Sequence, residues 1–207
     1  PRLTPSENAQ RYFKQYGKLK NSVAAVTEQI EKTREDIRYL ETVRQQLDDA
    51  GMADLEEIRE ELAAQGYVRE RKTPGKAKKK PDRPALTRYL SSEGVPIYVG
   101  KNNLQNDYLT NRFAAPNDTW LHAKDMPGSH VVIRGEYGER TLHEAAMLAA
   151  WFSRGKQSSS VPVDYTLIRH VRKPSGAKPG FVIYDKQKTL FVTPDEQLIK
   201  TLRTERQ

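Results

Sequence analysis

The chain has 207 residues, with 35 Lys plus Arg against 27 Asp plus Glu and no cysteine. The lack of cysteine excludes disulfides, thiolate zinc sites, iron–sulfur clusters and a cysteine nucleophile. Hydrophobic residues make up 36% and charged residues 30%, so we expect part of the chain to lie outside a packed core. No apolar run approaches the roughly 18 residues that span a bilayer. Since the sequence begins at Pro1 without an initiator Met, we expect it to be part of a longer protein.

The net charge of +8 is unevenly distributed. Residues 1–68 carry 10 basic and 13 acidic side chains, residues 69–83 carry 8 and 2, and residues 84–207 carry 17 and 12. A short basic block between two less charged regions predicts contact with a polyanion, either nucleic acid or a membrane surface. A solvated linker kept soluble by its charge is an equally good interpretation of this block.

The first region, residues 1–68, is predicted to be helical. Between Ser6 and Asp49 it has no proline and one glycine, with apolar residues at alternating spacings of three and four: Tyr12, Tyr16, Leu19, Val23, Val26, Ile30, Ile37, Leu40 and Leu47. This 3.5-residue repeat predicts a coiled-coil helix roughly 65 Å long. Ser6 is the expected cap, with Glu7 at the positive end of the helix dipole. We expect the partner helix in the absent N-terminal part of the protein or in a second chain.

A second, shorter helix is expected after the break at residues 48–51. Asp54 is its expected cap and Gly66 its end. Leu55, Ile58 and Leu62 form an apolar edge, but this helix is too short to pair with the whole first helix.

Residues 69–85 are predicted to be a basic linker. The segment has prolines, a glycine and a lysine run but no hydrophobic periodicity, which is typical of extended or disordered chain. Lys76, Lys78, Lys79 and Lys80 are therefore candidate contacts to phosphates.

Residues 86–207 are predicted to form a compact α+β domain, in which strands dominate and helices interrupt them without βαβ regularity. We expect helices at 102–113, 141–152 and 196–203. Strands are expected at 97–100, 119–124, 130–133, 165–171, 181–184 and 188–192, the last two joined as a hairpin through residues 185–187.

A search for catalytic chemistry finds no constellation that would make the protein an enzyme. His143 begins like a zinc-protease helix, but Met147 stands where the second ligand belongs. His122 and His130 lie on neighbouring predicted strands, where two hydrogen-bonded histidines are a better interpretation than a metal site. We expect no metal and no cofactor.

Polar and basic residues at turns are the candidates for binding. Lys101, Asn102 and Asn103 stand at a predicted helix N-terminus, where backbone N–H groups favour a phosphate, although simple capping by asparagine is as good an explanation. A second basic set surrounds a Pro/Gly loop and includes Arg169, Arg172, Lys173 and Lys178.

A third candidate surface follows from strand alternation. Asp118, Trp120, His122 and Lys124 share one face of a strand, and a Pro-Gly turn brings Ser129 and His130 beside them. We expect these residues to bind RNA, with Trp120 able to stack on a base. The alternatives are a core role for Trp120 and a turn-stabilising role for the others.

Three of these segments together resemble a known family. They are Ile97-Tyr-Val-Gly-Lys-Asn-Asn103 with Asn106-Asp107, Asp118-Thr-Trp-Leu-His-Ala-Lys-Asp-Met-Pro-Gly-Ser-His-Val-Val-Ile133, and Lys173-Pro-Ser-Gly-Ala-Lys-Pro-Gly180. In this order they resemble the RNA-binding NFACT-R domain, over about residues 86–200. The helical region and the linker are similar to the middle coiled coil of the NFACT family.

The resemblance implies ribosome-associated quality control. Such proteins bind the large ribosomal subunit with an obstructed peptidyl-tRNA and recruit alanyl-tRNA, so that the ribosome extends the stalled chain with alanine. It implies rRNA, ribosomal proteins and tRNA as partners, a cytoplasmic location and no enzymatic activity of its own. Bacterial members are often named fibronectin- or fibrinogen-binding proteins, so a cell-surface adhesin is the alternative.

Overall fold

The computed structural model describes residues 3–69 and 83–206. It divides at Leu40 into two compact units, residues 1–40 and 41–207. The sequence grouped residues 41–68 with the helical region, whereas in the structure they belong to the same unit as the sheet. The two units are described separately.

The first unit consists mainly of a continuous helix, α1 (Pro5–Asp48), as the unbroken repeat predicts. The expected cap is wrong by two residues, because the Thr4 hydroxyl accepts from the Glu7 backbone N–H and Glu7 accepts from the Thr4 backbone. Pro5 has no N–H and fits the first helical position, which places Thr4 rather than Ser6 at the cap. The apolar repeat is exposed, for example Tyr12 at 71% and Val23 at 65%.

The second unit contains the remaining helices and strands. In chain order these are α2 (Met52–Ala64), β1 (Thr87–Leu90), β2 (Pro96–Val99), α3 (Asn103–Tyr108), a π-helical turn (Leu109–Phe113), β3 (Thr119–Ala123), β4 (Val131–Ile133), α4 (Glu139–Trp151), β5 (Val161–Leu167), a 3-10 turn (Ile168–His170), β6 (Val171–Arg172), β7 (Ile183–Tyr184), β8 (Lys188–Val192), α5 (Glu196–Thr201) and β9 (Arg203–Arg206). The predicted α+β class is confirmed.

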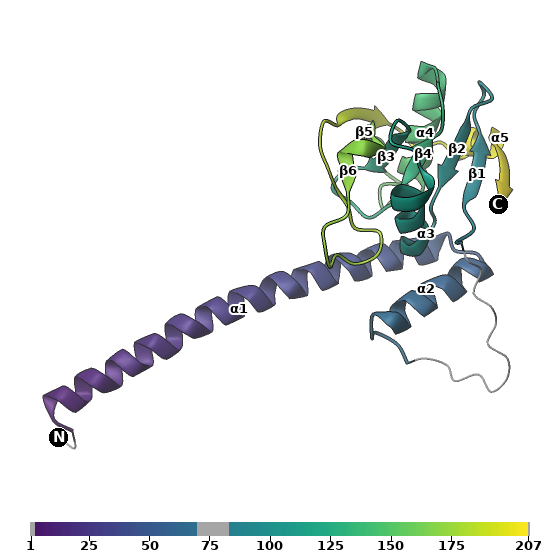
Figure 1. The fold of residues 1–207 in the computed structure, drawn as a ribbon. Coiled ribbons are helices and arrows are strands. Elements are labelled where there is room, and N and C mark those ends of the chain that lie inside the picture. The colour runs from purple at the N-terminus through teal and green to yellow at the C-terminus, as the bar shows by residue number, and fades with distance from the viewer. Residues whose placement is uncertain (1–2, 70–82, 207) are drawn as a thin grey trace. The chain divides into compact units, whose positions relative to one another are not determined.

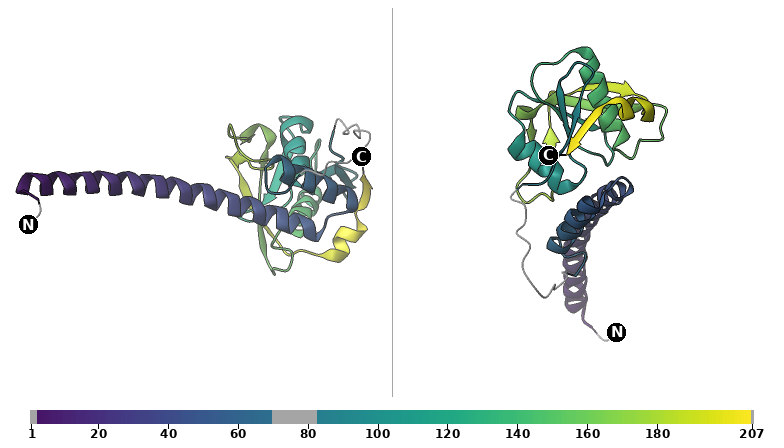
Figure 2. Two further views of the ribbon diagram at one scale, coloured as in Figure 1. Left: turned by 90° about the horizontal axis from the view of Figure 1, so that it is seen from below. Right: turned by 90° about the vertical axis from the view of Figure 1, so that its right-hand side faces the viewer.

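The strands form a seven-stranded sheet and a small two-stranded ribbon within the described residues. The sheet has the order β8-β5-β3-β4-β2-β1-β9, with antiparallel neighbours throughout, and β6 pairs with β7 in the ribbon. Figure 1 shows β3 and β4 in the middle of this domain and β9 beside β1. Figure 2 shows the same domain from below and from its right-hand side.

Side-chain alternation gives the sheet two buried faces. One face, with Leu121, Val131 and Ile133, packs against the alanine-rich helix α4. The opposite face, with Trp120 and Val132, packs against a smaller cluster that includes side chains of the π-helical turn and of the ribbon. The candidate binding residues of β3 point to this second, smaller cluster.

Two expectations about the C-terminal strands are wrong. β7 and β8 do not form a hairpin, because β7 pairs with β6 and β8 pairs with β5. The Tyr184 hydroxyl donates to the buried Asp164, and Lys186 adopts a left-handed backbone conformation at φ 54°. The chain therefore leaves the ribbon before β8 joins the edge of the sheet. The final helix ends at Thr201, and the highly charged segment after it is strand β9.

Helix α2 also begins earlier than expected. Its cap is Gly51, whose backbone N–H donates to the Asp54 carboxylate at 3.0 Å, so Asp54 is the third helical residue and not the cap. Gly66, at φ +80°, ends the helix as predicted. There the Tyr67 N–H donates back to the Leu62 carbonyl, the usual pattern for a glycine-terminated helix.

Candidate nucleic-acid interface

The first two family-like segments are joined through His130. The His130 backbone N–H donates to Asn106 Oδ1 at 3.0 Å, and the His130 carbonyl accepts from the Gly100 N–H at 3.0 Å. Its ring Nδ1 lies 2.8 Å from the Thr110 hydroxyl. A Cβ at position 100 would overlap Asn106, since it would lie 2.8 Å from the Asn106 backbone nitrogen. Glycine is therefore required where the first segment passes α3.

The third family-like segment, residues 173–180, contacts α3 as well. Lys173 Nζ lies 2.8 Å from Asp107 Oδ1, and the Gly180 N–H points to the same oxygen at 3.4 Å. Gly180 has φ +77° and packs on Asn103. Residues 97–107, 118–133 and 173–180 thus form one packed unit, which we call the motif junction.

An aromatic cluster on the inner side of the junction contains Trp120, His122, His130 and Tyr184. The Trp120 and His122 rings stack with centroids 5.7 Å apart, and the His130 ring meets both edge-on. Burial lowers the pKa of His122 to about 4. Burial, and secondarily the neighbouring His122, holds the pKa of His130 well below its usual range. Both rings are therefore neutral at pH 7.

At the start of α3, where a phosphate was predicted, Asn102 caps the helix by accepting from the Gln105 backbone N–H at 2.8 Å, and the side-chain amides donate to carboxylates of α2. Asn102 Nδ2 donates to Glu57 at 2.6 Å, and Asn103 Nδ2 donates to Glu61 at 2.9 Å. Gln105 donates to both Asp54 and Glu57. Asn102 and Asn103 are also buried. Their carboxamides therefore join the start of α3 to α2.

The predicted site residues fall into four groups. Trp120, Ser129, His130 and Asp118 are buried, whereas Lys101, His122 and Lys124 are half-buried. In the basic loop, Arg169 and Arg172 are exposed, Lys173 is paired with Asp107, and Lys178 donates to the Tyr67 hydroxyl. Lys76, Lys78, Lys79 and Lys80 lie outside the described residues. Direct contact of any of these residues with RNA stays a prediction.

Sequence reasoning did not select Asp107 and Thr110, which hold the junction together. Asp107 was quoted only as part of the family-like segment. The signal that points to both is their spacing, since they lie one helical turn beyond Asn103 and Asn106. Their partners at Lys173 and His130 are 66 and 20 residues away.

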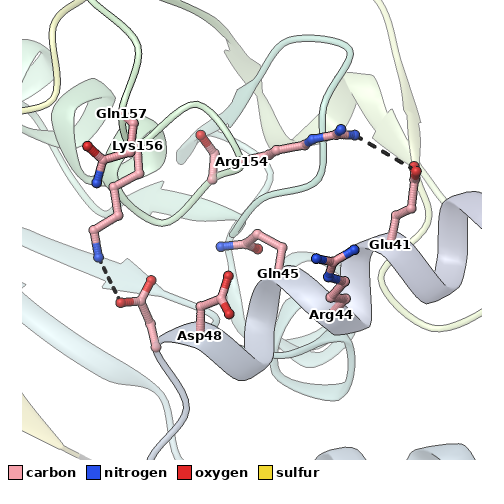
Figure 3. A pocket seen from close by; sticks show the side chains of 9 residues that line it. Glu41, Arg44, Gln45, Asp48, Arg154, Lys156 and Gln157 are labelled. Carbon is pink, nitrogen blue, oxygen red and sulfur yellow. Dashed lines mark hydrogen bonds and ion pairs between the residues drawn. The ribbon is translucent and has the colours of Figure 1, made fainter.

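A polar hollow of about 460 Å³ lies away from these residues, between the last turns of α1 and the turn after α4. Figure 3 shows its side chains, with Arg154 directed to Glu41 and Lys156 to Asp49. Lys156 also lies 4.1 Å from the centre of the Trp151 ring. Opposite charges are paired across this hollow, and none of the predicted binding residues lines it.

Residues 3–69 and 83–206 contain no group of three histidine, aspartate or glutamate side chains placed to hold a metal ion. Within the same residues, no helix combines the length and the apolar character that crossing a bilayer requires.

Comparison with known proteins defines the class to which this fold and junction belong. The family model described as NFACT N-terminal and middle domains matches residues 1–81, and the model described as NFACT protein RNA binding domain matches residues 86–185. The chain therefore belongs to the NFACT family.

Individual relatives agree with this assignment. The chain is 57% identical over 204 residues to the Rqc2 homolog RqcH of Bacillus subtilis, which covers 98% of this chain and 36% of that protein. It is 48% identical over 204 residues to the Rqc2 homolog RqcH of Streptococcus pneumoniae, which covers 97% of this chain and again 36% of that protein. The chain thus spans about a third of the length of these curated relatives.

A solved structure is similar over almost the whole chain. It is the C-terminal part of the fibronectin/fibrinogen-binding protein from Streptococcus suis, with a TM-score of 0.87 and 47% sequence identity. The match covers 98% of this chain and 81% of that one.

Proposed function

We propose that this chain is the ribosome-binding and RNA-binding part of a ribosome quality control factor. In this proposal it binds rRNA of the large subunit and tRNA, and it supports the alanine tailing of stalled nascent chains. The observation that carries the proposal is the match of residues 86–185 to the RNA-binding family model. The relatives named for RqcH at 57% and 48% identity support the quality control role.

The distribution of side chains is consistent with binding rather than catalysis. The histidines of the motif junction are neutral, and they pack against Trp120 and Thr110. Exposed cations lie beside the junction, at Arg169 in the 3-10 turn and at Arg172 in β6. We propose that the chain catalyses no step itself, that peptidyl transfer belongs to the ribosome, and that the protein works in the cytoplasm.

The exposed apolar repeat of α1 fits the same proposal. Its residues between Tyr12 and Ile37 repeat every 3.5 residues on average and are 45–71% exposed, whereas coiled-coil seams are buried against a second helix. We propose that a helix from elsewhere in the full-length protein, or from a second chain, covers this seam.

The test is sedimentation of the full-length protein from cell lysate on a sucrose gradient. We expect it to travel with the large ribosomal subunit and to carry tRNA, which a blot of the same fractions would detect. A protein that stays at the top of the gradient while large subunits are intact would contradict the proposal.

Adhesion to fibronectin or fibrinogen is the second candidate, because the similar solved structure carries that description. This function would place the protein at the cell surface. A basic domain also attracts acidic matrix proteins without dedicated contacts. Specific adhesion would persist at 0.5 M salt in surface plasmon resonance with purified fibronectin, where purely electrostatic attraction is largely screened.

A further inference from the structure

The two-stranded ribbon beside the motif junction has two chemically different faces. Its inner face contributes Val171, Val182 and Tyr184 to the smaller hydrophobic cluster around Trp120. In an antiparallel ribbon the alternate residues face the other way. Arg172 lies directly opposite Ile183 in the register, so both belong to the outer face.

The outer face exposes apolar surface that the fold does not use. Phe181 is 50% exposed and Ile183 is 39% exposed. Burial alternates from residue 181 to residue 184, with 181 and 183 exposed and 182 and 184 half-buried. Phe181, two residues before Ile183, therefore lies on the same side as Ile183 and Arg172.

Positive charge lies beside this apolar surface. Arg172 is exposed directly opposite Ile183. Arg169 and Lys186 are also exposed, both at the end of the ribbon where Val171 pairs with Tyr184. The nearest carboxylate in sequence, Asp185, lies 3.5 Å from the His170 ring. An exposed phenylalanine on the same face as an exposed arginine presents a flat ring to a base and a cation to a neighbouring phosphate.

We propose that Phe181, Ile183 and Arg172 form a platform on which single-stranded RNA stacks a base, with Arg172 on the adjacent phosphate. This proposal rests on the RNA-binding function proposed above and names the surface that performs it. Charge complementarity favours RNA over a protein partner, since the exposed charged residues of the ribbon and its flanks are Arg169, Arg172 and Lys186 against Asp185 alone. Stacking on a phenyl ring selects single strands over duplex without selecting a base sequence.

The platform can be tested with the 207-residue chain and a fluorescein-labelled 12-nucleotide oligouridylate, by fluorescence anisotropy over a range of salt concentrations. Phe181→Ala should weaken binding roughly tenfold and leave the salt slope unchanged, because phenylalanine carries no charge. Arg172→Gln should lower the salt slope by about 0.7. Phe181→Trp should bind at least as tightly as the unsubstituted chain.

Two controls separate stacking from indirect effects. Phe191→Ala removes another phenylalanine, 70% exposed on β8 outside the ribbon, and should change the affinity less than twofold. An abasic oligonucleotide of equal length should bind the unsubstituted chain and Phe181→Ala equally, because it has no base to stack. Circular dichroism melts would verify that the exposed substitutions leave the fold intact.

The outcomes distinguish this proposal from the broader one. If the unsubstituted chain binds neither the oligonucleotide nor purified large subunits, the RNA-binding function itself is contradicted. If the unsubstituted chain binds and Phe181→Ala binds equally well, the platform is wrong while the function stands. In that case the exposed ring would be assigned to contact with a protein.

Discussion

At the scale of single residues, the two central histidines stabilise the domain only while they are neutral. His130 is buried between Thr110, Asn106 and the Trp120 ring, and His122 stacks on Trp120 and meets the His130 ring edge-on. In the unfolded chain both would titrate near pH 6.5. The two histidines therefore bind protons in the unfolded chain at pH values at which they stay neutral in the folded domain.

This difference predicts a loss of stability in acid. Because the folded pKa of His122 is about 4, the unfolded state binds more protons as the pH falls from about 6.5 to about 4, and stability is lost across that window. We expect a decrease of about 2 kcal/mol from His122 alone. Urea unfolding at pH 7 and pH 4.5 measures it, with the double variant His122→Gln, His130→Gln as reference.

The comparison with the double variant removes the contribution of the carboxylates. The unsubstituted chain should lose more stability between the two pH values than the variant does. Equal losses would contradict the assignment of neutral histidines at positions 122 and 130.

Gly100 is a second residue with a definite role. A Cβ there would lie 2.8 Å from the Asn106 backbone nitrogen and 3.0 Å from its Cα, so we expect Gly100→Ala to destabilise the domain by about 1–3 kcal/mol through overpacking. Gly17→Ala is the matched control, because a Cβ at position 17 of α1 has no neighbour within 4 Å. That substitution should favour the helix by about 1 kcal/mol. Denaturant unfolding would give opposite signs, and the same sign for both would refute the packing argument.

At the scale of elements, helix α2 is joined to α3 by polar groups. Glu57 accepts from Asn102 and from Gln105, and both amide side chains are 0% exposed. A buried donor without its acceptor costs about 1–3 kcal/mol. The α2–α3 contact therefore depends on these hydrogen bonds, because the buried donors would lose stability without their acceptor.

Removing this acceptor is expected to loosen the start of α3. Glu57→Ala should destabilise the domain by about 1–3 kcal/mol and speed hydrogen exchange at residues 102–106. Glu56→Ala, on the exposed side of the same helix, should change both by little. If the two variants exchange at the same rate, the network does not hold α3 in place.

Elements with strong local signals were predictable, and those that depend on distant partners were not. The period of α1 and the alternation of residues 119–124 predicted a long helix and a strand, and the structure has α1 at 5–48 and β3 at 119–123. Strand β9 was missed because Arg-Thr-Glu-Arg has no apolar alternation and its strand conformation depends on pairing with β1. The β7–β8 hairpin was wrong because Tyr184 is anchored by Asp164, 20 residues away.

The same distinction applies to the candidate site. The resemblance rested on three segments, residues 97–107, 118–133 and 173–180, and the structure packs them against one another. Sequence alone could not show that Asn102 and Asn103 are buried against α2. Their carboxylate partners lie 45 and 42 residues away, respectively, and no local pattern links them.

At the scale of the whole molecule, the two proposed binding surfaces lie in different parts of the sequence. Residues 1–40 carry an exposed apolar repeat, and residues 169–186 carry the exposed Arg169 and Arg172 with Phe181 and Ile183. This separation fits a protein that meets a helix with one part and RNA with the other. The apolar and the charged contacts should respond differently to salt, because screening weakens only the charged ones.

Ultraviolet crosslinking of the chain to purified large ribosomal subunits, with mass spectrometry of the RNA-linked peptides, tests the central claim most directly. The claim is that the sheet domain contacts RNA through the ribbon beside the motif junction. We expect crosslinked peptides from residues 169–186, with Phe181 among the modified positions, and their loss in Phe181→Ala. Crosslinks confined to other parts of the chain, or none on subunits that retain the protein, would contradict it.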